Sequence, residues 1–497
     1  MQQTRTLADL GLTAQNGVQA QISGLAVDSR QVKDGTLFAA LPGSRVHGGE
    51  FIQYALRMGA SAILTDVEGA RIAADVLAAS DAALVVAQDP RSALAFAAAL
   101  WFGAQPEVMI AVTGTNGKTS VANFTRQIWQ ALDLPAVNLG TTGVEGDFEA
   151  PLAHTTPEPI TLHRVLAEAA NAGITHAAME ASSHGLEQRR LDGVRLDAAG
   201  FTNFTQDHLD YHHTFEAYFQ AKAGLFGRVL PEDGVAVINI DDPRGPEMVM
   251  LAQSRGQDVL SVGRAEAADL RLTGQRFDPT GQTLRFTWHG APYQVQLPLI
   301  GGFQGENVLL ASGLAIGTGT QAEQVFGVLH HMRTVRGRMQ LAATRENGAA
   351  VFVDFAHTPD AISTAIQALR PHVMGRLVAI IGAGGDRDAG KRPLMGQAAA
   401  EHADLVIVTD DNPRSEDPGL IRRAVMQGCP EATEVGDRAE AILRGVDAVG
   451  PGDALLVLGK GHETGQTVGD DILPFDDAEQ ASVAVMALDS AVNGGQA

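Results

Sequence analysis

The chain has 497 residues, of which 45% are hydrophobic and 19% are charged, and this composition excludes a disordered protein and predicts about two to four globular domains. Acidic residues outnumber basic ones by 58 to 36, and the net charge of −22 argues against non-specific binding to nucleic acid or to an anionic membrane surface. The single cysteine, Cys429, excludes an intrachain disulfide and a cysteine-rich zinc site.

Neither a secretory signal nor a membrane span is visible in the sequence. The first residues lack a charged segment followed by an apolar one, and no apolar run approaches the ~18–20 residues that a span requires. We therefore expect a soluble, cytoplasmic, monomeric protein that acts on small molecules and binds neither nucleic acid nor membranes.

Three blocks can be separated along the chain. Residues 1–105 mix short strand-like runs with helical stretches and end at a proline-containing linker. Residues 106–333 and 334–497 alternate short β-rich runs with amphipathic helices, which is typical of parallel sheets covered on both faces. The predicted fold class is α/β. Because such sheets bind ligands at the carboxyl ends of their strands, candidate site residues are expected just after each apolar run.

A phosphate-binding loop is predicted after the first strand of the second block. The apolar run 108–112 leads into TGTNGKTS at 113–120 and then into a helical stretch. A glycine-rich turn between strand and helix offers backbone N–H groups and the helix dipole to a phosphate. Lys118 would reach the β- and γ-phosphates, and the Thr119 hydroxyl would hold Mg²⁺. The residues predicted to bind ATP here are Gly114, Thr115, Asn116, Gly117, Lys118, Thr119 and Ser120.

Two further runs of the second block end in polar residues. The run 174–179 ends at Glu180, whose carboxylate would hold Mg²⁺ near the phosphate loop or, alternatively, serve as a turn or N-cap residue. Residues 207–213, DHLDYHH, could suggest zinc, but phosphate chemistry in this block favours Mg²⁺ and oxygen ligands. From spacing alone, His208 is either a site residue or a structural histidine.

In the third block, four apolar runs lead into charged turns. These turns are DFAHTPD at 354–360, GAGGDRD at 382–388, TDDNPR at 409–414 and GKGHE at 459–463. Any one of them could be an ordinary polar turn. Four on one sheet would line a single rim with cations and carboxylates, which predicts a binding site for a small molecule that carries both charges.

Together these motifs resemble those of the ATP-dependent Mur ligases of peptidoglycan synthesis. The resemblance covers nearly the whole chain, from DSR at 28–30 to residues 459–463, and includes HTTP at 154–157, MEASSHGL at 179–186 and GRM at 337–339. It implies three domains: an N-terminal UDP-substrate-binding domain, a central P-loop parallel-sheet ATPase domain and a C-terminal Rossmann-like domain for an amino acid. It also implies an enzyme that joins meso-2,6-diaminopimelate to the D-Glu side-chain carboxylate of UDP-N-acetylmuramoyl-L-Ala-D-Glu through an acyl phosphate.

The resemblance also implies roles for single residues. The catalytic set would be Lys118, Glu180, His208 and Lys222, and Mg²⁺ would be held by Thr119, Glu180, His208 and Lys222, the last as a carbamate (N6-carboxylysine). Asn307, Arg338 and Asp354 would contact the adenine, phosphate and ribose of ATP, while Gln304 stands where the family has asparagine. The residues implied for the UDP substrate are Ser29, Ser44, Arg45, Val46, Thr155, Thr156, Ser182, Gln188 and Arg190.

The diaminopimelate site implied by the resemblance explains the turn at 409–414. Its residues would be Arg387, Asp411, Asn412, Pro413, Arg414, Gly459 and Glu463. Diaminopimelate has a carboxylate at its far end, whereas lysine has only an ammonium there. The planar fork of Arg414 would pair with that carboxylate and repel the ammonium. The alternatives left open are the same reaction with L-lysine, a folylpolyglutamate synthase-like ligase and a nucleotide-binding protein without ligase chemistry.

Overall fold

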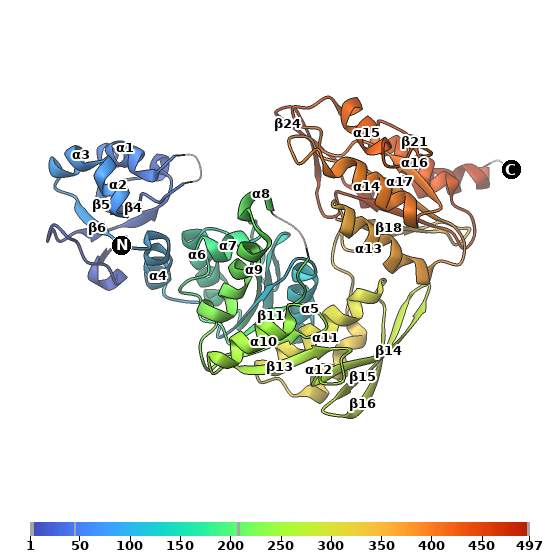
Figure 1. Cartoon of the computed structure of the whole chain (residues 1–497), viewed down its shortest axis with the longest axis horizontal. Coiled ribbons are helices and arrows are strands. Elements are labelled where there is room, and N and C mark those ends of the chain that lie inside the picture. Colours follow the sequence, from blue (N-terminus) through green and yellow to red (C-terminus); the bar gives the residue numbers. More distant parts are fainter. Residues whose placement is uncertain (1–3, 44–45, 206–208, 495–497) are drawn as a thin grey trace. The chain divides into compact units, whose positions relative to one another are not determined.

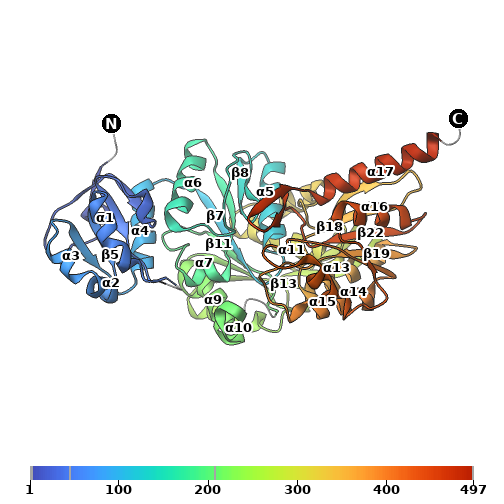
Figure 2. The ribbon, with the colours of Figure 1, turned by 90° about the horizontal axis from the view of Figure 1, so that it is seen from above.

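The computed structural model describes residues 4–43, 46–205 and 209–494, and its ribbon is drawn in Figures 1 and 2. The chain divides into two compact units, Met1–Leu270 with Leu310–Val325, and Arg271–Leu309 with Phe326–Ala497. Within the described ranges, none of the helices combines the length and the apolar character that crossing a bilayer requires.

A four-stranded parallel sheet in the order β3-β4-β5-β6 forms the first part of the chain (blue in Figure 1). Leu37 and Leu64 pack against α4, whereas Phe38 and Ile63 pack against α1 on the opposite face. This alternation follows from the two-residue period of a strand, so both faces of the sheet are buried. The bounds are β1 (Arg5–Thr6), β2 (Gln21–Ile22), β3 (Gly24–Ala26), β4 (Thr36–Ala39), β5 (Ala60–Thr65), β6 (Ala83–Val86), α1 (Ile52–Arg57), α2 (Val67–Ile72), α3 (Ala74–Ala78) and α4 (Pro90–Phe102).

The next sheet has ten strands, in the order β16-β15-β14-β13-β12-β11-β7-β10-β8-β9. From β13 to β8 the neighbouring strands are parallel, and β9 is antiparallel to β8. Figure 2 shows them between α5 and α11 on one side and α6, α7, α9 and α10 on the other. The strand bounds are β7 (Val108–Thr113), β8 (Ala136–Gly140), β9 (Gly143–Gly146), β10 (His176–Glu180), β11 (Ala198–Phe201), β12 (Val235–Asn239) and β13 (Asp258–Gly263). The helix bounds are α5 (Lys118–Ala131), α6 (Pro159–Asn171), α7 (Ser183–Glu187), α8 (Leu209–His212), α9 (Phe215–Gly224), α10 (Gly245–Ser254), α11 (Gly302–Gly317) and α12 (Ala322–Val328).

The register of these parallel strands positions the candidate site. Glu180, the last residue of β10, pairs with Val112 near the end of β7, and β10 also pairs with β8. The residues directly after β7, β8 and β10 therefore emerge side by side at one edge of the sheet.

The second unit contains a six-stranded sheet in the order β17-β18-β22-β19-β20-β21, with only β17 antiparallel to its neighbour. Apolar residues of α13, α14 and α15 cover one face, and those of α16 and α17 cover the other, as Figure 2 shows. The chain steps outward from β19 to β21 and then returns to β22, and right-handed crossovers place the helices of the outward and return paths on opposite faces.

The strands in this part of the chain are β14 (Leu270–Asp278), β15 (Gly281–Trp288), β16 (Ala291–Leu297), β17 (Gln340–Thr344), β18 (Ala350–Asp354), β19 (Leu377–Ile381), β20 (Leu405–Val408), β21 (Thr433–Glu434), β22 (Ala454–Leu458), β23 (Gly465–Val468) and β24 (Asp471–Pro474). The helices are α13 (Pro359–Leu369), α14 (Lys391–His402), α15 (Pro418–Met426), α16 (Arg438–Ala448) and α17 (Asp477–Gly494). The predicted α/β class is confirmed, while the boundaries proposed after residues 105 and 333 stay a prediction.

A buried ion pair fastens two helices to the end of β22. Arg438 begins α16 and Asp477 begins α17, and both side chains are 0% exposed. The guanidinium donates two hydrogen bonds to the Asp477 carboxylate, of 2.7 and 2.6 Å, and a third of 3.0 Å to the carbonyl oxygen of Leu458. Leu458 directly precedes the GKGHE turn, so this pair supports one wall of the predicted amino-acid site.

Replacing Arg438 by methionine should destabilise the second unit by about 3–5 kcal/mol, because the Asp477 carboxylate would be left buried without its cation. Urea unfolding followed by circular dichroism measures the change. The double variant Arg438→Met with Asp477→Leu should recover most of the loss. The control is Arg444→Met, which breaks the exposed pair with Glu440 and should cost less than about 1 kcal/mol. An effect of Arg438→Met no larger than that of the control would contradict the prediction.

Candidate active site

Glu180 lies at the centre of the candidate phosphate site. Its side chain is buried (2% exposed); one carboxylate oxygen accepts a hydrogen bond from the Thr119 hydroxyl (2.9 Å) and the other from the backbone N–H of Thr141 (2.8 Å). A Cβ on Gly140 would collide with this carboxylate, so the end of β8 needs glycine there. Three strand ends thus converge on one buried carboxylate.

The loop after β7 has the geometry of a phosphate cradle. Gly114 and Gly117 take positive φ angles of 148° and 86°, which favour glycine, and a Cβ on Gly114 would collide with the Thr202 hydroxyl. Lys118 opens α5, and its ammonium donates hydrogen bonds of 2.9 Å to the carbonyl oxygens of Gly114 and Thr115. The N–H groups at the start of α5 and the Lys118 charge favour an anion at this point.

Lys222 meets the same loop from α9. It is 1% exposed, donates a 2.6 Å hydrogen bond to the carbonyl oxygen of Gly114, and lies 4.5 Å from the centre of the Tyr218 ring. Lys118 and Lys222 therefore share one acceptor. Nothing in the sequence pattern around Lys222 distinguishes it from a surface lysine, and only the family resemblance singled it out.

The donors around Glu180 are suited to Mg²⁺. Thr119 and Glu180 supply hard oxygen ligands, and the hydrogen bonds that Glu180 accepts come from neutral donors. In the described part of the chain, no group of three or more His, Cys, Asp or Glu side chains could cage a metal. Mg²⁺ commonly uses one or two carboxylates together with phosphate oxygens and water, so this set fits. His208, another of the four expected ligands, lies outside the described residues.

Most residues expected to meet the UDP substrate form one hydrogen-bonded network beside Glu180. The Thr156 hydroxyl donates to the carbonyl oxygen of Glu180 (2.9 Å) and accepts from the N–H of Ser182 (3.0 Å). Arg190 donates to the Thr156 carbonyl oxygen (2.5 Å) and to the side chain of Gln188 (2.8 Å). Burial lowers the pKa of the Arg190 guanidinium, and the nearby charge of Arg91 lowers it further. The Thr155 hydroxyl lies 3.1 Å from that of Thr141.

The remaining UDP-substrate candidates are less well connected. Ser29 begins a short 3₁₀ helix capped by Asp28, and among the described residues no hydrogen bond joins it to the network around Thr156. Val46 is 52% exposed. Ser44 and Arg45 lie outside the described residues.

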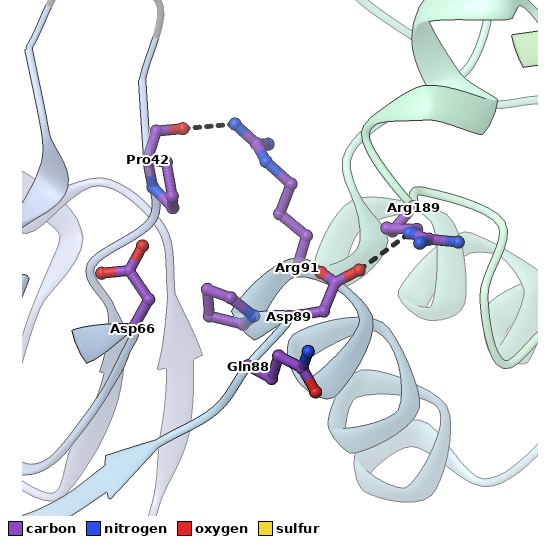
Figure 3. Close-up of a pocket in the computed structure, with 7 residues that line it drawn as sticks. Pro42, Asp66, Gln88, Asp89, Arg91 and Arg189 are labelled. Atoms are coloured by element: carbon purple, nitrogen blue, oxygen red, sulfur yellow. Dashed lines mark hydrogen bonds and ion pairs between the residues drawn. The ribbon is translucent and has the colours of Figure 1, made fainter. Parts of the chain in front are cut away.

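A pocket that the sequence analysis missed opens beside α4 (Figure 3). It measures about 520 Å³, and its lining residues are Pro42, Asp66, Gln88, Asp89, Pro90, Arg91 and Arg189. Arg91 donates a short hydrogen bond to the Pro42 carbonyl oxygen, and Arg189 pairs with Asp89 at 2.8 Å. Asp89 caps α4 directly after β6, so the strand-end rule, applied to the first block, would have found this site.

The predicted diaminopimelate turn is held by the hairpin β23–β24. Arg414 takes a positive φ of 51°. Its N–H donates to the Thr467 carbonyl oxygen (3.1 Å), and its guanidinium donates to the Gly385 carbonyl oxygen (2.7 Å). A Cβ on Gly384 would lie 2.8 Å from the same guanidinium. The glycine-rich loop after β19 therefore leaves space for Arg414. One edge of the Arg414 guanidinium is occupied by its hydrogen bond to Gly385.

The other residues expected at this site gather around Asn412. Asp411 and Asn412 are both 7% exposed, and the Asn412 amide donates a 2.9 Å hydrogen bond to Glu463. Gly459 takes a positive φ of 119° at the end of β22. Arg387 is exposed, and the hydrogen bond from its guanidinium to the Asp386 carbonyl oxygen is long at 3.4 Å.

The remaining ATP candidates belong to the second unit. Both oxygens of Asp354 accept backbone hydrogen bonds, from Met339 (2.7 Å) and Ala356 (2.9 Å), and burial raises the pKa of its carboxyl group. The Arg338 guanidinium lies 4.8 Å from the centre of the Phe355 ring. Asn307 on α11 donates a 3.0 Å hydrogen bond to Gln304, the residue that departs from the family pattern.

Comparison with known proteins gives matches along most of the chain. Three family models match: the Mur ligase family catalytic domain over residues 21–101, the Mur ligase middle domain over 112–315 and the Mur ligase glutamate ligase domain over 337–461. A relative from Bradyrhizobium diazoefficiens is 49% identical over 94% of this chain and 95% of its own, and one from Caulobacter vibrioides is 46% identical over 94% and 96%. Both are named UDP-N-acetylmuramoyl-L-alanyl-D-glutamate–2,6-diaminopimelate ligase.

Solved structures agree with these matches. A structure with the same ligase name superposes with a TM-score of 0.72 at 33% identity and covers 98% of this chain and 99% of its own. A second ligase, MurF from Acinetobacter baumannii, has a TM-score of 0.63 at 18% identity over 92% and 95%, which shows a shared fold. Family models match over the three larger sheets, and the relatives are nearly half identical over almost its full length, so this chain belongs to the Mur ligase family.

Proposed function

We propose that this protein is the ATP-dependent ligase that joins meso-2,6-diaminopimelate to UDP-N-acetylmuramoyl-L-alanyl-D-glutamate during synthesis of the peptidoglycan precursor. The observation that carries the proposal is the charged turn after β20, which contains Arg414 and Asn412 and is joined to Glu463 of the turn after β22 by the Asn412 hydrogen bond. Relatives at 45–49% identity over 94% of the chain carry the name of this ligase. We further propose that it acts in the cytoplasm, as a monomer.

The reaction requires an unreactive carboxylate to become an acylating group. ATP transfers its γ-phosphoryl group to the D-glutamate side-chain carboxylate, the amine of diaminopimelate attacks the acyl phosphate, and phosphate leaves as the amide forms. Lys118 and the N–H groups at the start of α5 would stabilise the negative charge that develops on the transferred group. Mg²⁺ held by Thr119 and Glu180 would neutralise charge on the phosphate oxygens.

The arginines beside α4 suit a UDP-linked substrate. Arg91 and Arg189 line the pocket of Figure 3, and Arg190 is close enough to Arg91 for the two charges to interact. Such a cluster of cations favours a diphosphate. Thr155, Thr156 and Ser182, which lie in the network beside Glu180, would then meet the peptide end that is phosphorylated.

We propose that Lys222 carries a carbamate in the active enzyme. Two ammonium groups that share the Gly114 carbonyl oxygen repel one another, and burial removes the water that would screen them. Carbamylation replaces the Lys222 cation by an anion and supplies a further oxygen ligand near the phosphate loop.

The direct test is the product formed from ATP, Mg²⁺ and UDP-N-acetylmuramoyl-L-alanyl-D-glutamate, with meso-diaminopimelate or L-lysine in parallel, identified by mass spectrometry. Tripeptide is expected with diaminopimelate and little or none with lysine. Equal product with lysine would contradict the proposed role of Arg414. Hydrolysis of ATP without either amine would contradict the ligase itself.

Replacing Arg414 by lysine should raise KM for diaminopimelate at least about tenfold, because a single ammonium cannot reproduce the planar fork facing a carboxylate. Steady-state kinetics with diaminopimelate as the varied substrate measure the change, and KM for ATP should stay the same. The matched control is Arg423→Lys, an exposed arginine on α15, which should behave as the unmodified enzyme. An unchanged KM for diaminopimelate in Arg414→Lys would rule out the pairing.

Replacing Lys222 by alanine should lower kcat by about 10- to 100-fold, since a ligand of the metal environment is lost. Isotope-labelled bicarbonate should give a carbamate carbon signal in the NMR spectrum of the unmodified enzyme, and that signal should be missing from the variant. The exposed residue Lys33 provides the control, because Lys33→Ala should keep both the signal and the activity. A spectrum without any carbamate signal from the active enzyme would disprove the modification.

A further inference from the structure

Lys460, in the turn after β22, is an ammonium group enclosed by acceptors. Its side chain is 0% exposed, although lysine is rarely buried without partners. The ammonium donates 2.8 Å hydrogen bonds to the side-chain oxygen of Asn412 and to the carbonyl oxygen of Gly465. The carboxylates of Asp411 and Glu463 lie 3.4 and 3.5 Å away. These four acceptors come from the turn at 409–414, from the turn after β22 that contains Lys460 itself, and from the hairpin β23–β24.

The contacts of Lys460 fix the orientation of the Asn412 amide. The amide oxygen accepts hydrogen bonds from Lys460 and from the backbone N–H of Thr467 (2.9 Å). A flipped amide would direct its NH₂ group at both donors, so only one orientation is compatible with them. In that orientation the NH₂ group donates to one oxygen of Glu463 (2.9 Å). That carboxylate is held from one side, while its side chain remains 35% exposed toward solvent.

We propose that Lys460 is a positioning residue for the distal amino-acid head of diaminopimelate. It orients Asn412, and through Asn412 it holds Glu463 ready to accept the distal ammonium. It also balances the charges of Asp411 and Glu463, which would otherwise repel each other in a buried turn. Lys460 itself touches no substrate, since its donors are occupied within the protein. This inference rests on the proposed function and adds Lys460, to which the family resemblance assigned no role.

The test is the variant Lys460→Met, which keeps the length of the side chain and removes its charge and donors. KM for diaminopimelate should rise about tenfold or more, while kcat at saturating diaminopimelate and the KM values for ATP and the UDP substrate stay within about twofold. A residue that only supported the fold would instead lower kcat and the thermal midpoint, and raise all three KM values together. Lys33→Met is the matched control, since it makes the same change at an exposed lysine.

A second comparison keeps the test decisive if Lys460→Met folds poorly. The double variant Lys460→Met with Asp411→Asn removes one positive and one negative charge together, so the buried turn stays balanced. Its KM for diaminopimelate should still exceed that of Asp411→Asn alone by about tenfold. Equal KM values in these two variants, or an unchanged KM in Lys460→Met, would overturn the proposal. Absence of any tripeptide from the unmodified enzyme would instead contradict the proposed function.

Discussion

The hydrogen bond from Thr119 to Glu180 joins the helix after β7 to the end of β10, and the rest of the phosphate site depends on it. A buried carboxylate without a cation must find donors, and here they come from Thr119 and from the backbone of Thr141 at the end of β8. The missing side chain of Gly140 leaves the space. Parallel pairing of β8, β10 and β7 is what places these three groups within reach, so the chemistry of the site follows from strand register.

Individual cations at the candidate sites would allow this acidic protein to bind anionic substrates in spite of its negative net charge. The chain carries a net charge of −22, yet three cations of its candidate sites donate hydrogen bonds to backbone carbonyl oxygens. Lys118 and Lys222 share the Gly114 carbonyl oxygen, and Arg414 donates to that of Gly385. Backbone carbonyls hold such a cation in place without cancelling its charge, whereas a carboxylate partner would neutralise it. An anionic substrate therefore meets a positive group that is already oriented.

Strand-end reasoning predicted much of the site, because it needs only the order of the apolar runs and the polarity of the residues directly after them. It identified the phosphate loop, Glu180 and the turn at 409–414, all of which lie at carboxyl ends of parallel strands. It missed Thr141, which acts through its backbone, and the Asp89–Arg189 pair, whose partners lie a hundred positions apart. Lys33 and Lys222 look alike in the sequence. Only the folded chain distinguishes the exposed Lys33 from the buried Lys222, since burial is decided by distant segments.

The side-chain amide of Asn412 links Arg414, in the turn after β20, to Glu463, in the turn after β22. The backbone N–H of Thr467 donates a hydrogen bond to the side-chain oxygen of Asn412, and Lys460 donates to the same oxygen. The carbonyl oxygen of Thr467 in turn accepts a hydrogen bond from the backbone N–H of Arg414. One connected set of hydrogen bonds thus positions both Arg414 and Glu463. Arg414 would bind a carboxylate, and Glu463 would bind an ammonium. An amino acid presents both groups at a fixed separation. Recognition of that separation requires that the two charged groups be held at a fixed distance, and the Asn412 amide links the two turns that carry them.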